Sequence, residues 1–168
     1  MKRTMSKPKA QSQQLDELLF LIEQSYNKKA WHGTNLRGSI RGISAREAAW
    51  RPGTGRHKIW EIMVHCAYWK YVVRRRILGE KKGSFPLKGS NWFQRSADLG
   101  EQAWREDINL LESCHRSLLD AVSQLSPGEL SRTPAGSKVS NLAIIVGIAS
   151  HDVYHAGQIQ LLKRLQRQ

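Results

Sequence analysis

The last long segment of the chain, Asn141 to about Arg167, constrains the fold most because it joins an apolar stripe to two histidines. His151 and His155 stand four residues apart, so on an α-helix their Cβ atoms lie about 5–6 Å apart on one face. Aliphatic residues continue this face at helical spacing: Ile144, Ile148, Ile159 and Leu162. Buried imidazoles need hydrogen-bond partners or a metal, and helical proteins often hold a divalent ion with such a pair. The segment predicts a helix that presents two ligands to the interior.

Three earlier segments have the same helical period, over about 12–30, 59–78 and 98–125. Gly79 is a predicted C-cap and Ser140 a predicted N-cap, while Asp98 and Glu101 have the spacing of a capping box. The connection 80–97 exceeds the ~2–8 residues that usually join antiparallel neighbours, so it predicts a crossover between parallel helices. We expect an all-α fold, a four-helix bundle with up-down-down-up topology and long connections.

The chain has 168 residues, 40% of them apolar, which fits one domain over 12–168 after a basic tail, 1–11, that we expect to be disordered. No apolar run approaches the ~20 residues that span a bilayer, and the N-terminus lacks the apolar core of a signal peptide. We therefore expect a cytoplasmic protein without a membrane partner. Cys66 and Cys114 lie in helical patterns and are predicted to be packed thiols.

The net charge of +13 raises nucleic acid, an anionic surface or an acidic ligand as partners. Part of this charge lies in the N-terminal tail, and the rest is dispersed along the chain. Such scatter is typical of a solvated basic face, so nucleic-acid binding is possible but not favoured.

A firm divalent site needs a third ligand besides His151 and His155, and the sequence offers His32, His57, His65 and His115. His65 is the strongest candidate because it projects from the apolar face of a long helix. Three neutral imidazoles leave positions open on zinc, nickel, iron or manganese, as in a catalytic site. Residues near these positions are candidates for orienting a ligand or transferring a proton: Glu61, Asp152, Tyr154 and Gln158.

Three features have more than one interpretation each. His115, within the apolar stripe of the third segment, is either a further group near the metal or a proton carrier, or it is a core histidine bonded to a carbonyl or side chain, and we favour the core histidine. The aromatics of the long connection, Phe85, Trp92 and Phe93, either anchor it or line a pocket mouth, and we favour anchoring. The spacing of His151 and His155 also resembles the zinc-protease motif, which we reject because no His, Asp or Glu follows to supply its third ligand.

Several of these residues together resemble the DinB-like superfamily: Trp31-His32-Gly33, His65 in its helix, the His151/His155 pair and Gly157-Gln158-Ile159. The resemblance covers nearly the whole chain after the tail. It implies a four-helix bundle with a three-histidine divalent site at His65, His151 and His155, and commonly a homodimer. Some relatives resemble thiol-dependent transferases or isomerases that use bacillithiol or mycothiol, and others look like hydrolases.

The leading hypothesis is a metal-dependent enzyme whose ion binds a low-molecular-weight thiol or a water and acts on a small-molecule substrate as a transferase or hydrolase. The alternative is a basic module for nucleic acid or a protein partner, of a stress-response type, with a structural metal or none. A third possibility is a stress-linked scaffold whose dimer interface is the working surface.

Overall fold

The structure is a computed structural model that describes residues 7–81 and 83–167, with side chains from residue 13 onward. Within these residues it is helical without strands. Four helices are long: α1 (Lys7–Tyr26), α4 (Ile59–Leu78), α5 (Gly100–Ser123) and α6 (Asn141–Leu165). Four are short: α2 (Leu36–Ser39), α3 (Ala45–Ala48), η1 (Ala97–Leu99) and η2 (Pro127–Ser131). The predicted all-α class is confirmed.

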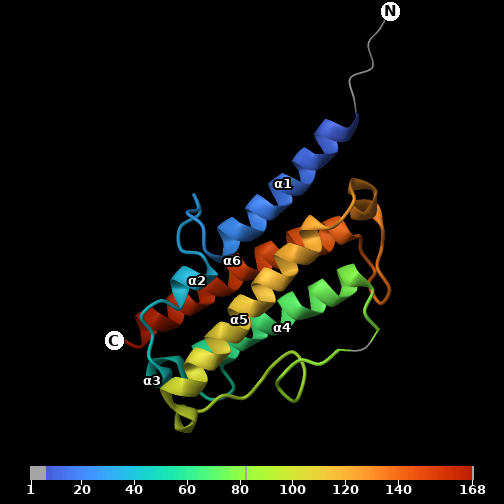
Figure 1. The fold of residues 1–168 in the computed structure, drawn as a ribbon. Coiled ribbons are helices and arrows are strands. Elements are labelled where there is room, and N and C mark those ends of the chain that lie inside the picture. The colour runs from blue at the N-terminus through green and yellow to red at the C-terminus, as the bar shows by residue number, and fades with distance from the viewer. Residues whose placement is uncertain (1–6, 82, 168) are drawn as a thin grey trace, which may run out of the picture.

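The long helices pack side by side, α1 against α6, α6 against α4, α4 against α5, and α5 against α1. In Figure 1 the chain runs from upper right to lower left in α1 and α6, and in the opposite sense in α4 and α5. The long connection between α4 and α5 passes below them in this view. Residues 59–78 and 141–165 pack directly against each other, which brings their histidines together.

Polar residues interrupt the apolar core at matching levels of three helices. On α4, Lys70 lies between Ala67 of one apolar cluster and Val73 of the other. His115 on α5 and Asp152 on α6 also lie between residues of the two clusters. All three polar side chains are buried. Buried charges must be paired, and Lys70 of α4 pairs with Asp152 of α6. This contact fixes the position of α4 along α6.

The helix ends confirm some predicted caps and correct others. Gly79 ends α4 in the left-handed region, with φ 69°, and the Ser140 side chain accepts from the Ala143 amide at the start of α6. The predicted capping box of Asp98 and Glu101 is wrong. Asp98 lies in η1, and the Glu101 carboxylate accepts from the backbone amide of Ala45 at 2.7 Å, which ties α5 to the start of α3.

The first helix is displaced toward the N-terminus relative to its predicted range of 12–30. It begins at Lys7, so the predicted tail of 1–11 overlaps it, and residues 1–6 of that tail lie outside the described residues. It ends at Tyr26 because the chain turns away there: the amides of Asn27 and Lys28 both donate to the Glu23 carbonyl, and Asn35 caps the Lys28 carbonyl at 2.7 Å.

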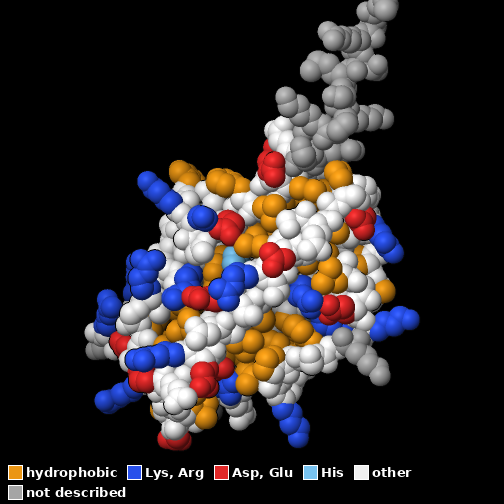
Figure 2. Space-filling model, viewed as in Figure 1, with side chains coloured by type: hydrophobic (Ala, Val, Ile, Leu, Met, Phe, Trp, Pro, Cys, Tyr) orange, Lys and Arg blue, Asp and Glu red, His pale blue; other side chains and the backbone are white. Residues whose placement is uncertain are grey.

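The surface in Figure 2 carries lysine and arginine side chains scattered among acidic and apolar ones, without a continuous basic stripe. Among the described residues, no helix combines the length and apolar character that crossing a lipid bilayer requires. Cys66 and Cys114 are free and buried, as predicted.

Candidate metal centre

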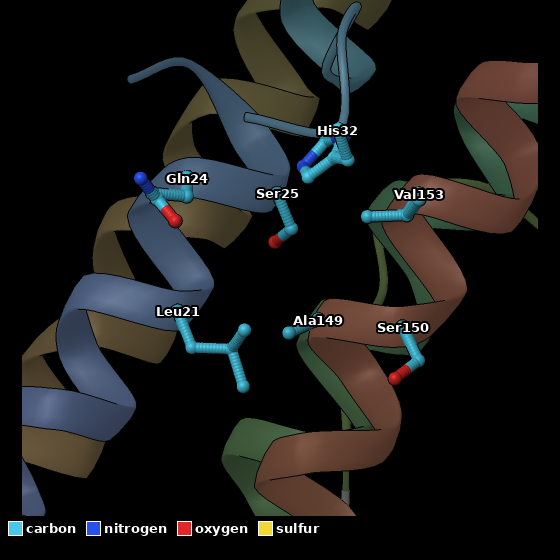
Figure 3. A pocket seen from close by; sticks show the side chains of 7 residues that line it. All are labelled: Leu21, Gln24, Ser25, His32, Ala149, Ser150 and Val153. Carbon is cyan, nitrogen blue, oxygen red and sulfur yellow. The ribbon is translucent and has the colours of Figure 1, made fainter. Parts of the chain in front are cut away.

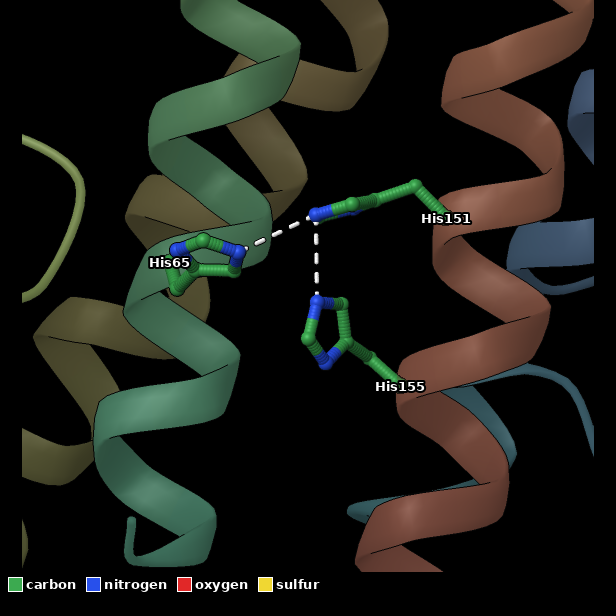
Figure 4. Close-up of side chains that lie close together, drawn as sticks. All are labelled: His65, His151 and His155. Atoms are coloured by element: carbon green, nitrogen blue, oxygen red, sulfur yellow. Dashed lines mark hydrogen bonds between the residues drawn. The ribbon is translucent and has the colours of Figure 1, made fainter.

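Three histidines from two helices converge between α4 and α6 (Figure 4). His65 projects from the middle of α4, and His151 and His155 project one turn apart from α6. The Nε2 atoms of His65 and His151 are 3.1 Å apart, as are those of His151 and His155. All three ligand atoms lie within 4.8 Å of one another. A metal that binds imidazole nitrogens at ~2.0–2.1 Å sets pairs of them about 2.9–3.4 Å apart at bond angles of about 90–110°.

The hydrogen bonds on the outer nitrogens fix where two of the rings carry their protons. The Nδ1 of His65 lies 2.8 Å from the Asn91 carbonyl oxygen, and the Nδ1 of His155 lies 2.7 Å from the Gln158 side-chain oxygen. Because both oxygens only accept, both Nδ1 atoms carry hydrogen and both Nε2 atoms present lone pairs. The Nε2 of His151 can donate to one of them and not to both. A cation at the centre would satisfy all three nitrogens, so the residues fit a metal.

Burial keeps the three imidazoles in the neutral form that a metal requires. Desolvation lowers the pKa of His65 to about 4 against the opposing hydrogen bond to Asn91, and it lowers the pKa of His151 to about 3, helped by the neighbouring histidines. It also lowers the pKa of His155. Proton competition for these nitrogens is therefore weak at neutral pH.

A short stretch of the long connection holds His65 from outside, which the sequence did not predict. Trp92 stacks on the His65 ring with centroids 3.9 Å apart, and on its other side it stacks on His57 at 3.6 Å. Asn91, the one non-glycine described residue with positive φ, accepts from His65 through its carbonyl and from Trp69 through its side chain. Asparagine tolerates this conformation better than most residues, which is the signal available in the sequence.

Phe85 and Phe93 contact each other and Tyr68, so these two aromatics anchor the connection as favoured. Trp92 instead stacks on His65 and His57 and lines the mouth of a groove, which is the interpretation that was not favoured.

Tyr154 and Glu61 lie near the three histidines in sequence, but their side chains bond to other residues. The Tyr154 hydroxyl accepts from the Gln158 amide nitrogen at 3.0 Å, which extends the hydrogen-bond chain from His155 to an exposed phenol. Glu61 pairs with Arg51 at 2.8 Å and accepts from the backbone amide of Lys58 at 3.2 Å. Glu61 therefore caps α4 and holds the preceding loop.

Asp152, next to His151 in sequence, turns to a different partner. Its carboxylate forms an ion pair with the Lys70 ammonium, and both side chains are fully buried. A ring nitrogen of His151, the Asp152 carboxylate and the Cys66 thiol also lie within 4.8 Å of one another. This second group is a poor cation site because the Lys70 ammonium already occupies the carboxylate and burial raises the pKa of the Cys66 thiol well above its usual range. Lys70 was not recognised from the sequence.

His115 is not part of the three-histidine cluster. It stacks on Tyr26 with centroids 3.7 Å apart, and neither ring nitrogen has a hydrogen-bond partner among the described residues. The expectation of a carbonyl or side-chain hydrogen bond is therefore wrong, and the nearest carboxylate, Glu23, lies 3.8 Å from its Nε2. The ring is held by stacking and packing. Desolvation lowers the pKa of His115 to about 2.

Two of the hollows beside α6 have histidines in their lining. The larger, a groove of about 790 Å³, includes His155, Trp92 and His57 in its lining and so reaches the three-histidine cluster at His155. The smaller, about 230 Å³, lies between α1 and α6. Figure 3 shows its lining side chains: Leu21, Gln24, Ser25, His32, Ala149, Ser150 and Val153. His32 is exposed there and does not join the three histidines.

The fold and the centre define an all-helical protein with a three-histidine group that could hold a metal ion. A model of the DinB superfamily matches residues 30–159, so the chain belongs to this superfamily. No curated protein matches the chain. Its fold is similar to a crystal structure described as the conserved protein of a locus from Enterococcus faecalis, with a TM-score of 0.55 and 14% identity over 96% of this chain and 98% of that chain. At this identity the likeness concerns the fold alone.

Proposed function

We propose that this chain is a metal-dependent enzyme in which His65, His151 and His155 hold one divalent ion. The observation that carries the proposal is the convergence of three Nε2 atoms, two of which must present lone pairs because their rings donate through Nδ1. Three ligands leave coordination positions open, which is typical of catalytic rather than structural sites. The long helices, proposed as an up-down-down-up bundle, supply a rigid frame for ligands from α4 and α6.

The proposed reaction is either the transfer of a low-molecular-weight thiol to a small-molecule substrate or the hydrolysis of such a substrate. A divalent ion supplies Lewis acidity there and favours a thiolate or hydroxide near neutral pH. Asn91 and Gln158 orient two of the ligands through Nδ1. Tyr154 lies at the groove, where its hydroxyl can exchange a proton with a bound substrate. Asp152 and Glu61 act at a distance as positioning residues, through Lys70 and through the Arg51 loop.

Metal content decides the first part of this proposal. Tag-free protein, purified and then supplied with zinc, nickel, iron or manganese, is dialysed and analysed by elemental mass spectrometry and by zinc titration calorimetry. We expect one ion per chain in the wild type and a loss of about 100-fold or more in affinity for His151→Ala, since one of three ligands is removed. His32→Ala is the matched control and should bind like the wild type.

A wild-type chain that retains no divalent ion would refute the proposal, as would equal affinity in His151→Ala. Catalysis needs a separate measurement: thiol conjugation to an electrophile and cleavage of an ester, each with and without the ion. Activity that persists after metal removal would contradict the proposed chemistry even if the ion binds.

A further inference from the structure

The groove beside the three histidines has an apolar wall that the described part of the chain leaves uncovered. Leu161 is 59% exposed and Leu165 is 39% exposed, and both line the groove with the buried Leu162. At a rise of about 1.5 Å per residue, the ten residues from His155 to Leu165 extend about 15 Å along α6. A ligand whose reacting end lies at His155 therefore has room for an extended apolar body on this wall.

The opposite wall is the loop 52–57, which carries the guanidinium of Arg56. Arg56 and His57 line the groove, and no Asp or Glu among the described residues does, although the His57 Nδ1 lies 3.4 Å from the Glu61 carboxylate behind it. Arg56 forms no ion pair within the described part of the chain, whereas Arg51 is held by Glu61 at 2.8 Å. The Arg51 guanidinium also donates to the Arg56 carbonyl, so the loop is fixed while the Arg56 side chain stays available. This arrangement favours an anion.

We propose that the groove binds an amphipathic small-molecule anion, with its carboxylate at Arg56 and its apolar body on Leu161 and Leu165. The volume of about 790 Å³ lies within the range of small-molecule sites, roughly 300–1,000 Å³. Because this ligand would be the substrate of the metal centre, the inference rests on the function proposed above. It adds a substrate class: an anion with an aliphatic or aromatic body.

Decanoate tests the groove by titration calorimetry on the full chain, both zinc-loaded and metal-free. We expect one site in both forms, weakened by salt. Arg56→Gln should weaken binding about tenfold, because a charge-assisted hydrogen bond is lost. Leu161→Ser should weaken it about fivefold through lost apolar contact. The matched controls are Arg105→Gln on α5 and Val146→Ser at the far end of α6, both exposed residues outside the groove. They should bind decanoate like the wild type.

Equal decanoate affinity in the wild type and Arg56→Gln would overturn the inference, and so would preferential binding of decyltrimethylammonium. A second outcome would also overturn the inference: the wild type forms a concentration-dependent dimer, Leu161→Ser abolishes this dimer, and decanoate does not bind. The apolar wall would then be an interface with a second copy of the chain. Failure of the wild type to bind zinc refutes the proposed function instead, and decanoate binding to the metal-free protein still decides whether the groove takes the anion.

Discussion

The buried pair of Lys70 and Asp152 yields a quantitative prediction. Both side chains are 0% exposed, and the pair joins α4 to α6. Lys70→Met leaves the Asp152 carboxylate in the core, where its Oδ1 already has no hydrogen-bond partner among the described residues. Removing one partner of such a pair costs about 3–5 kcal/mol. This is a large part of the ~5–15 kcal/mol that stabilises a typical domain.

The cost should depend on pH in a defined direction. Burial raises the pKa of Asp152 from 3.8 to about 6, against the lowering effect of Lys70. Without Lys70 the folded-state pKa rises further above the unfolded value. The folded variant then binds more protons than the unfolded chain, so its relative stability is greatest below the unfolded pKa and is lost as pH rises through the folded pKa. The deficit of Lys70→Met should be small at pH 4.5 and complete at pH 8.

Urea unfolding followed by circular dichroism, with chelator present, measures these differences at each pH. The double variant Lys70→Met/Asp152→Leu should recover most of the loss, because no buried charge remains unpaired. The partly exposed pair of Arg37 and Glu112, 2.7 Å apart, is the matched control, and Arg37→Met should cost less than the buried pair, about 1 kcal/mol. A Lys70→Met deficit below about 1 kcal/mol at pH 8, or one that does not shrink on acidification, would refute the reasoning.

Three further predictions concern the histidines. Trp92→Ala removes the ring stacked on His65 and should weaken zinc affinity about tenfold, with unchanged affinity contradicting the role of Trp92. Gln158→Leu removes the acceptor that orients His155 and should have an effect of about 10–100-fold in the same titration. Burial lowers the pKa of His115 to about 2, so below pH 6.5 the unfolded chain binds a proton at this histidine and the folded chain does not. The free energy of unfolding therefore falls by about 1.4 kcal/mol for each pH unit of acidification. His115→Phe should flatten the acid side of the stability profile by this amount, and an unchanged slope between pH 6 and 5 would count against it.

The sequence by itself determined the long helices and the candidate ligands. Apolar residues at helical spacing place Ile148 and Ile159 inside, and the same period carries His151 and His155 to one face. Gly79 and Ser140 marked helix ends because caps are local chemistry. These features depend on residues within one or two turns of one another, which is why periodicity and spacing reveal them.

The tertiary structure alone decided what surrounds those ligands. Lys70 meets Asp152 across 82 positions of sequence, and Trp92 reaches His65 only because the connection folds back over α4. Glu101 bonds to Ala45 rather than capping its own helix. Such partners are set by how helices and loops pack in three dimensions. Many pairings of residues far apart in the chain are compatible with the same local sequence pattern. Burial and hydrogen bonding select one of them.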